Sequence, residues 1–243
     1  VSVAVACLMY MVSFRGIEAL FSVSSRHEAG YIGAMLFVIP GFPFITSGLD
    51  IAKLDMRSGL ERMAHALTII IVATMVGWLT AMSINFKPED FIPLQLTSWQ
   101  LLALRLPASF CGVFGFSLMF NSSPKLASTA GIIGALANTL RLELVDFTNV
   151  PPAAAAFAGA LLAGLLASIL GKKAGYPRIS LTVPAIVIMV PGLYMYRAVY
   201  NIGLNSISVG AYWLTQATLI VLALPLGLIA ARILTDPKWR YSD

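Results

Sequence analysis

Long apolar stretches alternate with short polar ones along all 243 residues of the chain. Eight stretches are apolar enough to predict membrane segments. They cover residues 1–13, 31–47, 63–84, 101–120, 126–140, 151–170, 181–199 and 211–233. The stretches are too continuous for the alternating strands of a membrane barrel, and helices satisfy their own backbone hydrogen bonds in lipid. The pattern predicts an all-α, polytopic helical membrane protein with about eight spans in this chain.

The first and sixth segments each carry a further expectation. A membrane helix needs about 20 mostly apolar residues, so residues 1–13 are interpreted as the end of a helix that begins upstream. Residues 151–170 are dominated by Ala and Gly. Small residues let helices approach closely in membranes, and we therefore expect this segment to be buried among other helices.

Two segments are interrupted by a Pro-Gly pair, Pro40–Gly41 in the second and Pro191–Gly192 in the seventh. Proline removes a backbone donor and clashes with the preceding turn. Backbone groups freed in this way are tolerated at membrane depth only beside protein or water. The ends of the resulting half-helices carry partial charge and can bind a substrate or an ion. The alternative is a simple kink, because proline is common in membrane helices.

An offset of 151 residues aligns the two breaks and several further positions. The aligned identities are Pro40 with Pro191, Gly41 with Gly192, Gly59 with Gly210, Ala66 with Ala217, and Ile69 with Ile220. The second and seventh segments cross the membrane in opposite directions, which is the arrangement of an inverted repeat. A repeat unit of five helices predicts that two helices are missing before residue 1.

Composition agrees with the membrane class and adds an orientation. Hydrophobic residues make up 58% of the chain and charged residues 11%, against about 25% charged in soluble domains. When the loops alternate across the bilayer, one side receives ten basic residues: Lys53, Arg57, Arg62, Lys125, Lys172, Lys173, Arg178, Arg232, Lys238 and Arg240. The other side receives four, Arg15, Arg26, Lys87 and Arg141. This bias predicts a multi-pass membrane protein with a cytoplasmic C-terminus.

Arginines and asparagines near the predicted spans suggest a binding site. Arg197 follows the second break by five residues, and an arginine there is costly unless it is paired or faces water. It could hold a substrate carboxylate in a bidentate fork. Arg105 either joins the site or reaches the interface with its charged end. Asn121 and Asn138 lie at span ends, where they could bind a carboxylate or ammonium group or form ordinary interhelical hydrogen bonds.

Three further expectations concern charged or titratable positions. Arg141 and Glu143 could pair with each other at a helix end. The run "SGLDIAKLDMRSGLER" predicts an amphipathic cytoplasmic helix. Its mixed charges suit either a solvated surface or a gate between the halves. His65, just inside the next span, could titrate in a proton-coupled cycle or be structural.

Several kinds of chemistry have no signature in the sequence. There is no Walker A pattern, dinucleotide fingerprint, HExxH or GxSxG motif. We therefore expect no enzyme, no cofactor and no metal. Cys7 and Cys111 lie in apolar runs without metal-like spacing and are interpreted as packing residues. The net charge of +5 is spread over loops, so no nucleic-acid partner is expected.

Three phrases together resemble the threonine/serine exporter family: "PGFPFITSGLDIAKLDMRSGLER", "GFSLMFNSSPKLASTAGIIGALANTLRLEL" and "IVIMVPGLYMYRAVYNIG". The resemblance covers nearly the whole chain. It implies that residues 1–97 are the C-terminal part of a first membrane domain and that residues 98–243 are a second. It also implies a secondary exporter of threonine and serine by proton antiport, located in the inner (cytoplasmic) membrane. Members with split domains are associated with export of small dicarboxylates such as succinate, which stays open as an alternative. A passive channel and a non-transporting scaffold also stay open.

The partners expected from this resemblance are a small amino acid or carboxylate, protons, the lipid bilayer and a second copy of the chain. The residues expected to bind substrate or to gate its path are Pro40, Gly41, Asn121, Asn138, Arg141, Pro191, Gly192, Tyr196 and Arg197. The residues expected to couple protons or to form a cytoplasmic gate are Asp50, Asp55, Arg57, Glu61 and His65.

Overall fold

We describe a computed structural model of the chain, in all residues except 22–28, 37, 39, 84–95 and 238–243. The described residues form ten helices and no strand, which confirms the all-α prediction. The chain divides into two compact units. Unit 1 comprises residues 1–40, 64–95 and 191–217, and unit 2 comprises residues 41–63, 96–190 and 218–243.

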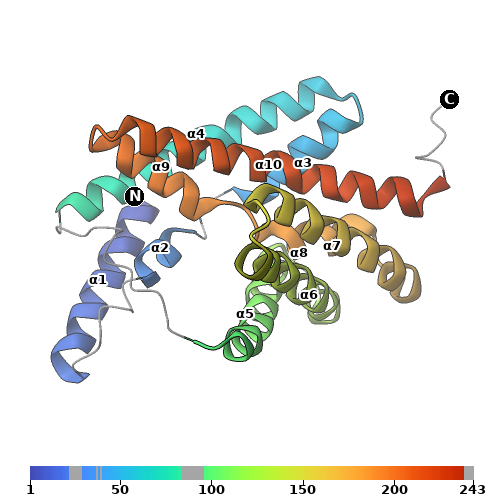
Figure 1. Cartoon of the computed structure of the whole chain (residues 1–243), viewed down its shortest axis with the longest axis horizontal. Helices are drawn as coiled ribbons and strands as arrows, with labels where there is room; N and C mark the ends of the chain where they lie inside the picture. Colours follow the sequence, from blue (N-terminus) through green and yellow to red (C-terminus); the bar gives the residue numbers. More distant parts are fainter. Residues whose placement is uncertain (22–28, 37, 39, 84–95, 238–243) are drawn as a thin grey trace. The chain divides into compact units, whose positions relative to one another are not determined.

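Unit 1 contains α1 (Ser2–Phe21), α2 (Ala29–Leu36), α9 (Gly192–Gly203), most of α4 (Met56–Ser83) and the start of α10 (Ile207–Thr235) (Figure 1). Its core joins apolar and aromatic side chains from four of these helices. Cys7 of α1, Tyr31 and Met35 of α2, and Tyr196 of α9 are fully buried there. Gly77 of α4 allows the close approach, because a Cβ at this position would lie 2.7 Å from the Met35 sulfur.

The expectation that residues 1–13 are only a helix end is wrong in its boundary. Helix α1 continues to Phe21, has 20 residues and is apolar enough to cross a membrane by itself. The apolar run is interrupted at Arg15 and Glu18, but these two side chains face each other one turn apart, with Arg15 Nη1 3.4 Å from Glu18 Oε2. Such pairs at a spacing of three residues support helix continuation.

Unit 2 contains α3 (Gly41–Ala52), α5 (Ser98–Met119), α6 (Pro124–Thr148), α7 (Pro152–Ala174), α8 (Arg178–Val187) and the remaining parts of α4 and α10. Helix α6 is central, because it packs against α5, α7 and α8 (Figure 1). Ser123 caps the start of α6 by accepting a hydrogen bond from the Leu126 amide, and Pro124 follows at the first helical position.

The Ala- and Gly-rich helix α7 buries one face against its neighbours, as expected from its composition. The contact with α10 is close: a Cβ on Gly227 would lie 2.5 Å from the Phe157 carbonyl oxygen, and one on Gly164 would lie 2.5 Å from the Ala231 Cβ. Backbones can approach this closely in membranes only where side chains are small. The glycines therefore set the spacing of α7 and α10.

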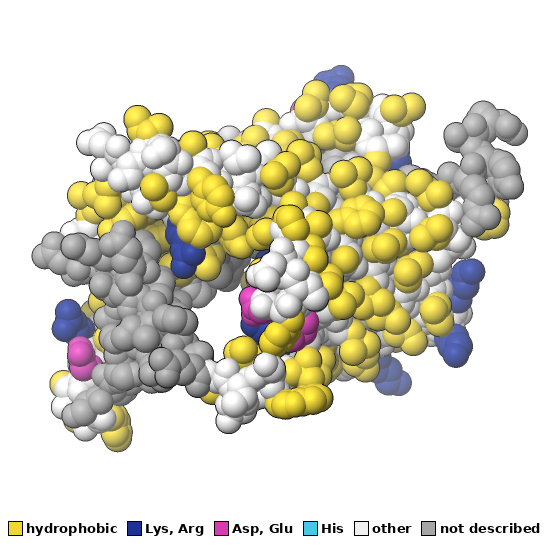
Figure 2. All heavy atoms as spheres, viewed as in Figure 1, with side chains coloured by type: hydrophobic (Ala, Val, Ile, Leu, Met, Phe, Trp, Pro, Cys, Tyr) yellow, Lys and Arg dark blue, Asp and Glu magenta, His cyan; other side chains and the backbone are white. Residues whose placement is uncertain are grey.

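Apolar side chains remain on the outside of the helices, as a membrane requires. On α10 they include Leu219, Leu222 and Leu226, which share one helical stripe. Hydrophobic side chains cover much of the visible surface (Figure 2). Among the described helices, five are long and apolar enough to cross a membrane, or six if α8 and α9 form one broken span. The chain is a multi-pass membrane protein, and the count of eight spans stays a prediction.

Helix boundaries recur at the offset of 151 residues. Helices α3 and α9 each have 12 residues and begin at Gly41 and Gly192, the glycines of the two Pro-Gly pairs. Helices α4 and α10 begin at Met56 and Ile207, again 151 residues apart. The local fold after each break is therefore the same. That the two copies are inverted in the membrane stays a prediction.

The turns that follow α3 and α9 also match. Each contains a left-handed residue, Leu54 with φ of 65° and Asn205 with φ of 60°. In each, the next amide, that of Asp55 or Ser206, donates to the carbonyl five residues earlier. This bond satisfies a carbonyl that the helix end leaves without a partner. The same device thus reverses the chain at equivalent positions.

Candidate functional site

The first Pro-Gly break lies against the chain that leads into the second. Gly41 begins α3, and a Cβ at this position would lie 2.6 Å from Val187 Cγ2 and 3.2 Å from Val190 Cγ2. These three residues all belong to unit 2. A side chain larger than hydrogen at position 41 would therefore force the end of α8 away. Pro40, Pro191 and Gly192 belong to unit 1.

Both breaks replace regular helical hydrogen bonds by tighter turns. The Val38 amide donates to the Met35 carbonyl, and the Met189 amide donates to the Ile186 carbonyl. These two bonds span three residues instead of four and are again 151 positions apart. Since a tightened turn changes which carbonyls are bonded, each break presents backbone polar groups differently from an intact helix.

A polar cluster in unit 2 contains three of its helical side chains: Ser109 of α5 and Asn138 and Arg141 of α6. We call these residues the Arg141 cluster. Asn138 Nδ2 donates to Ser109 Oγ at 2.9 Å, and Arg141 Nη1 donates to Asn138 Oδ1 at 3.4 Å. Asn138 is buried and Arg141 is half-buried. Asn138 therefore fixes the arginine through a second hydrogen bond to the neighbouring helix.

Within unit 2, the Arg141 cluster lies near the tightened turn at the end of α8. A Cβ on Gly159 of α7 would lie 3.2 Å from Arg141 Cβ and 3.3 Å from Met189 Sδ, and all three residues belong to unit 2. Because Gly159 has no side chain, only its backbone lies between Arg141 of α6 and Met189 of the tightened turn. The arrangement brings the Cβ of Arg141, a residue whose guanidinium suits carboxylates, close to the turn that ends α8.

Arg105 forms a second charged group with α6. Its Nη1 lies 2.9 Å from Glu143 Oε1, and its Nη2 contacts Asp146 Oδ2. The Arg105 side chain is only 16% exposed, and the alternative that its charged end reaches the membrane interface stays a prediction. Glu143 pairs with Arg105, and the expected pairing of Arg141 with Glu143 stays a prediction.

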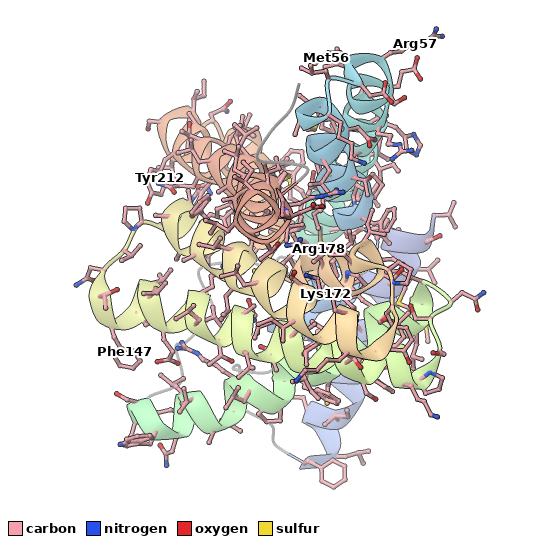
Figure 3. The ribbon with its side chains drawn as sticks, turned by 90° about the vertical axis from the view of Figure 1, so that its right-hand side faces the viewer. Met56, Arg57, Phe147, Lys172, Arg178 and Tyr212 are labelled. Atoms are coloured by element: carbon pink, nitrogen blue, oxygen red, sulfur yellow. The ribbon has the colours of Figure 1, made fainter. Side chains whose placement is uncertain are left out.

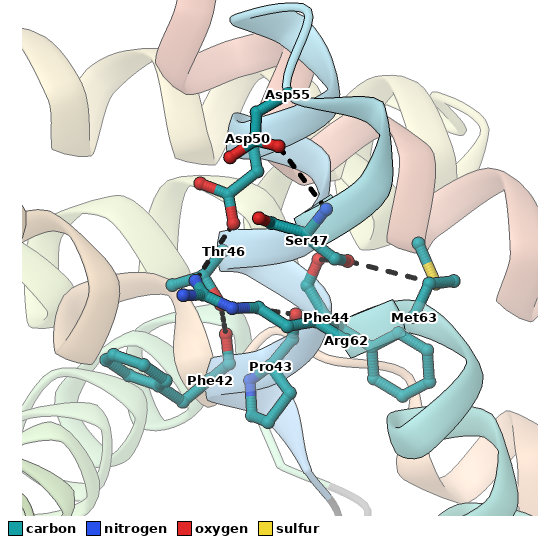
Figure 4. Close-up of polar contacts among 10 residues, drawn as sticks. Phe42, Pro43, Phe44, Thr46, Ser47, Asp50, Asp55, Arg62 and Met63 are labelled. Carbon is teal, nitrogen blue, oxygen red and sulfur yellow. Dashed lines mark hydrogen bonds and ion pairs between the residues drawn. The ribbon is translucent and has the colours of Figure 1, made fainter. Parts of the chain in front are cut away.

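The expected amphipathic cytoplasmic helix is two helices. The left-handed Leu54 ends α3, and α4 starts immediately after Asp55. Asp55 Oδ1 accepts a hydrogen bond from the Ser58 amide at 3.3 Å, which is the ordinary role of an N-cap. Asp55 therefore caps the start of α4 in this turn (Figure 4), and its expected part in coupling or gating stays a prediction.

The remaining expected gate residues line the α3–α4 hairpin. Asp50 Oδ2 lies 2.9 Å from Arg62 Nη1, which ties α3 to α4 within unit 2 (Figure 4). Arg57 and Glu61 pair at 3.1 Å on an exposed face of α4, where such pairs contribute little. His65 is exposed on α4 in unit 1. Of the ion-paired residues in this group, Asp50 has the least exposed side chain, at 19%.

In unit 1, two of the expected residues stand next to each other on α9. Tyr196 is fully buried, and its hydroxyl has no hydrogen-bond partner among the described residues. The Arg197 guanidinium carbon lies 4.8 Å from the centre of the Trp213 ring, in a cation–π contact. Asn121 lies outside both groups: it is exposed in the turn between α5 and α6, where it adopts φ of 60°.

Sequence reasoning missed the roles of Ser109 and Asp146 and the pairing of Glu143 with Arg105. Ser109 is 29 residues from its partner Asn138, and Arg105 is 38 and 41 residues from its two partners. No local pattern links positions so far apart. The parts of the chain that the structure describes contain no group of three or more His, Cys, Asp or Glu side chains that could hold a metal ion.

Comparison with known proteins identifies relatives of both halves of the chain. Residues 105–234 match the family model described as "Threonine/Serine exporter, ThrE", and residues 1–85 match a second model, described as "Putative threonine/serine exporter". An uncharacterized protein of Haemophilus influenzae is 31% identical over 134 residues. This match covers 54% of the chain and 44% of that protein, so the chain spans less than half of the relative's length. No solved structure matches the chain.

Proposed function

The chain belongs to the threonine/serine exporter family, and from that premise we propose that it exports threonine and serine across the cytoplasmic membrane by proton antiport. The family match and the apolar helices support a membrane exporter. The substrate and the coupling ion are the proposed part. A small dicarboxylate is the second candidate substrate, because a site built on arginine suits any carboxylate.

The observation that carries the proposal is the Arg141 cluster. A threonine or serine molecule brings one carboxylate, and a guanidinium binds a carboxylate with two parallel hydrogen bonds. Asn138 and Ser109 restrict the orientation of Arg141. An arginine within a membrane helix is costly, so such a residue is a candidate for a functional site. Because Arg141 also lies near a broken helix, it is a candidate for the substrate site. Arg197, stacked on Trp213, is the second candidate carboxylate anchor.

We propose Asp50 as the proton-coupling residue. Its carboxylate is largely shielded and pairs with Arg62 across the α3–α4 hairpin that follows the first break. Protonation of Asp50 would cancel this attraction and loosen the hairpin. A hairpin that opens on protonation would link the proton gradient to access.

The test is counterflow of labelled threonine, serine and succinate into proteoliposomes that contain the full-length protein. We expect Arg141→Ala to reduce counterflow of the true substrate by about tenfold or more, the loss of a charge-assisted bidentate contact. Arg141→Lys keeps the charge without the fork and should be intermediate. Arg15→Ala is the matched control, since Arg15 is exposed and its ion pair is with Glu18 of its own helix.

The same vesicles separate the alternatives. Saturable counterflow of normal affinity in Arg141→Ala would remove this residue from the site. Preference for succinate would replace the amino-acid proposal by dicarboxylate export. Flux that neither saturates nor exchanges would indicate a channel, and absence of flux a scaffold. An imposed pH gradient should drive uphill accumulation in wild type but not in Asp50→Asn, if protons are the coupling ion.

A further inference from the structure

Unit 2 contains a cavity that the transport proposal does not use. It has a volume of about 690 Å³ and lies at the ends of three helices, where α7 finishes, α8 starts and α10 finishes. The turn after α3 completes it through Lys53. A smaller hollow of about 60 Å³ shares Lys53 and Arg178 as lining residues and extends it toward Leu49 and Leu228. The lining residues all belong to unit 2.

The cavity is strongly basic. Four cationic side chains line it, one from each chain segment that meets there: Lys53, Lys172, Arg178 and Arg232. Asp236 is the one acidic residue among its described lining, and it lies 4.0 Å from Arg232, at the limit of an ion pair. Four cations against one carboxylate leave an excess of positive charge. Figure 3 shows Lys172 and Arg178, which reach this cavity from α7 and α8.

The arginine at the centre of this group is held in place. Arg178 Nη2 donates to the Gly164 carbonyl of α7, and Nη1 donates to Thr235 Oγ1 of α10, both at 2.8 Å. Its position at the first residue of α8 adds the partial positive charge of a helix start, where the amides lack helical acceptors. Pro177, the N-cap, provides no side-chain acceptor for these amides. The Arg178 side chain and the first backbone amides of α8 thus lie together at one edge of the cavity.

Basic residues are common in the cytoplasmic loops of membrane proteins, where they need not line a shared cavity. Here the cations come from distant parts of the sequence, from Lys53 to Arg232, and line a common space. Since α7 and α10 are helices long enough to cross a membrane, we expect their ends to lie near the lipid headgroups. Basic pockets at this depth suit phosphate groups.

We propose that this cavity binds a phosphate-bearing anion, either the headgroup of an anionic phospholipid or a soluble phosphate compound. The charge bias predicts that the cavity opens on the cytoplasmic side. The inference is independent of the transported substrate, because it involves none of the residues of the Arg141 cluster.

The test measures thermal unfolding of the purified full-length protein in an uncharged detergent. One arm adds inorganic phosphate or pyrophosphate, and its control is chloride at equal ionic strength. The other arm adds short-chain phosphatidylglycerol, and its control is phosphatidylcholine of the same chain length. A ligand that binds only the folded protein raises the unfolding temperature in a concentration-dependent way, and the midpoint of this dependence gives the affinity.

Lys53→Gln and Lys172→Gln are the informative variants, because both side chains are exposed and neither forms an ion pair with a described residue. We expect each to weaken binding about five- to tenfold, the effect of losing one charge-assisted contact. Lys173→Gln is the matched control, since Lys173 is the exposed neighbour of Lys172 but does not line the cavity. Arg178→Gln is avoided, because Arg178 also ties three helices together.

The two arms decide the source of the phosphate. Stabilisation by phosphatidylglycerol alone assigns the site to a lipid, and stabilisation by phosphate or pyrophosphate assigns it to a soluble ligand. Either result supports the proposal if Lys53→Gln and Lys172→Gln weaken it and Lys173→Gln does not. The proposal is overturned if the phosphate compounds stabilise the protein no more than chloride or phosphatidylcholine does. Equal weakening by all three substitutions would overturn it as well.

Discussion

Among single residues, Arg105 has the clearest structural role. It pairs with two acidic side chains, and both of these, Glu143 and Asp146, lie on α6. Removing a shielded cation leaves its partners without compensation, which costs more than the pair itself contributes. We expect Arg105→Met to lower the unfolding free energy by about 1–3 kcal/mol.

Thermal unfolding in detergent measures this effect. A loss of that size corresponds to a drop of roughly 2–12 °C for a chain of this length. Arg15→Met, which removes an exposed pair within one helix, should change the midpoint little. Adding Glu143→Gln to Arg105→Met should restore part of the loss, because one uncompensated charge is removed. Equal drops for Arg105→Met and Arg15→Met would show that the α5–α6 ion group contributes nothing specific.

At the scale of elements, the two hairpins that follow the breaks depend on one glycine each. A Cβ on Gly59 or on Gly210 would lie 2.5 Å from the isoleucine eight residues earlier, Ile51 or Ile202. In both cases it would also lie 3.1 Å from the carbonyl oxygen twelve residues earlier. Each glycine therefore lets the second helix of its hairpin pack on the backbone of the first.

We expect Gly59→Ala and Gly210→Ala to destabilise the protein by similar amounts, about 1–3 kcal/mol each, because the added methyl group overpacks a closed contact. Gly115→Ala in α5 is the control, since nothing lies within 4 Å of its Cβ position. There the same substitution should be neutral or slightly stabilising. Unfolding midpoints of the three variants, measured side by side, give the comparison. If Gly59→Ala and Gly210→Ala lowered the unfolding midpoint no more than Gly115→Ala does, the close packing of the hairpins would be contradicted.

The elements that sequence could predict are those with a local signal. Pro40–Gly41 and Pro191–Gly192 mark the breaks at which α3 and α9 begin, because proline and glycine act on the adjacent turn. The turn at Leu54 was missed, since a leucine gives no sign of a left-handed conformation, whereas Asn205 at the matching position is a common turn residue. The extension of α1 past Arg15 was missed because a hydropathy pattern counts Arg15 and Glu18 as two charges and does not show that they form an ion pair.

The candidate site was less predictable than the helices. Asn138 and Arg141 could be selected because polar residues in apolar helices are costly. Ser109 and Arg105 lie on α5, whereas their partners lie on α6. Only the packing of α5 on α6 therefore brings these groups together. The basic cavity of unit 2 needs four separate segments to meet, which no single stretch of sequence encodes.

On the scale of the whole molecule, the two halves exchange hairpins. Residues 41–63, from the first half, belong to unit 2, and residues 191–217, from the second half, belong to unit 1. Within unit 2, the hairpin of residues 41–63 packs closely against residues of the second half. A Cβ on Gly48 would lie 2.4 Å from Pro225 Cγ, and Gly41 contacts Val187. Residues 98–243 alone would lack a hairpin that fills their own unit. We therefore expect the two membrane domains proposed for 1–97 and 98–243 to depend on each other for folding.

The proposed inverted arrangement of these halves gives a prediction about sidedness. Lys53 and Leu204 occupy equivalent places in the two matching turns, 151 residues apart, and both side chains are exposed. An inverted repeat puts equivalent turns on opposite sides of the membrane, and the bias of basic residues puts Lys53 in the cytoplasm. After Cys111, the exposed native cysteine, is replaced by serine, single cysteines at positions 53 and 204 can be labelled with an impermeant maleimide.

We expect Leu204→Cys to react in intact spheroplasts, and Lys53→Cys to react only after the membrane is permeabilised. Lys172→Cys should behave as Lys53→Cys does, because both residues line the basic cavity. Reaction of positions 53 and 204 from the same side would mean that the repeat runs in one direction. Two broken helices of like orientation would then present the same helix ends to a substrate. The pairing of opposite half-helix ends on which alternating access depends would be lost.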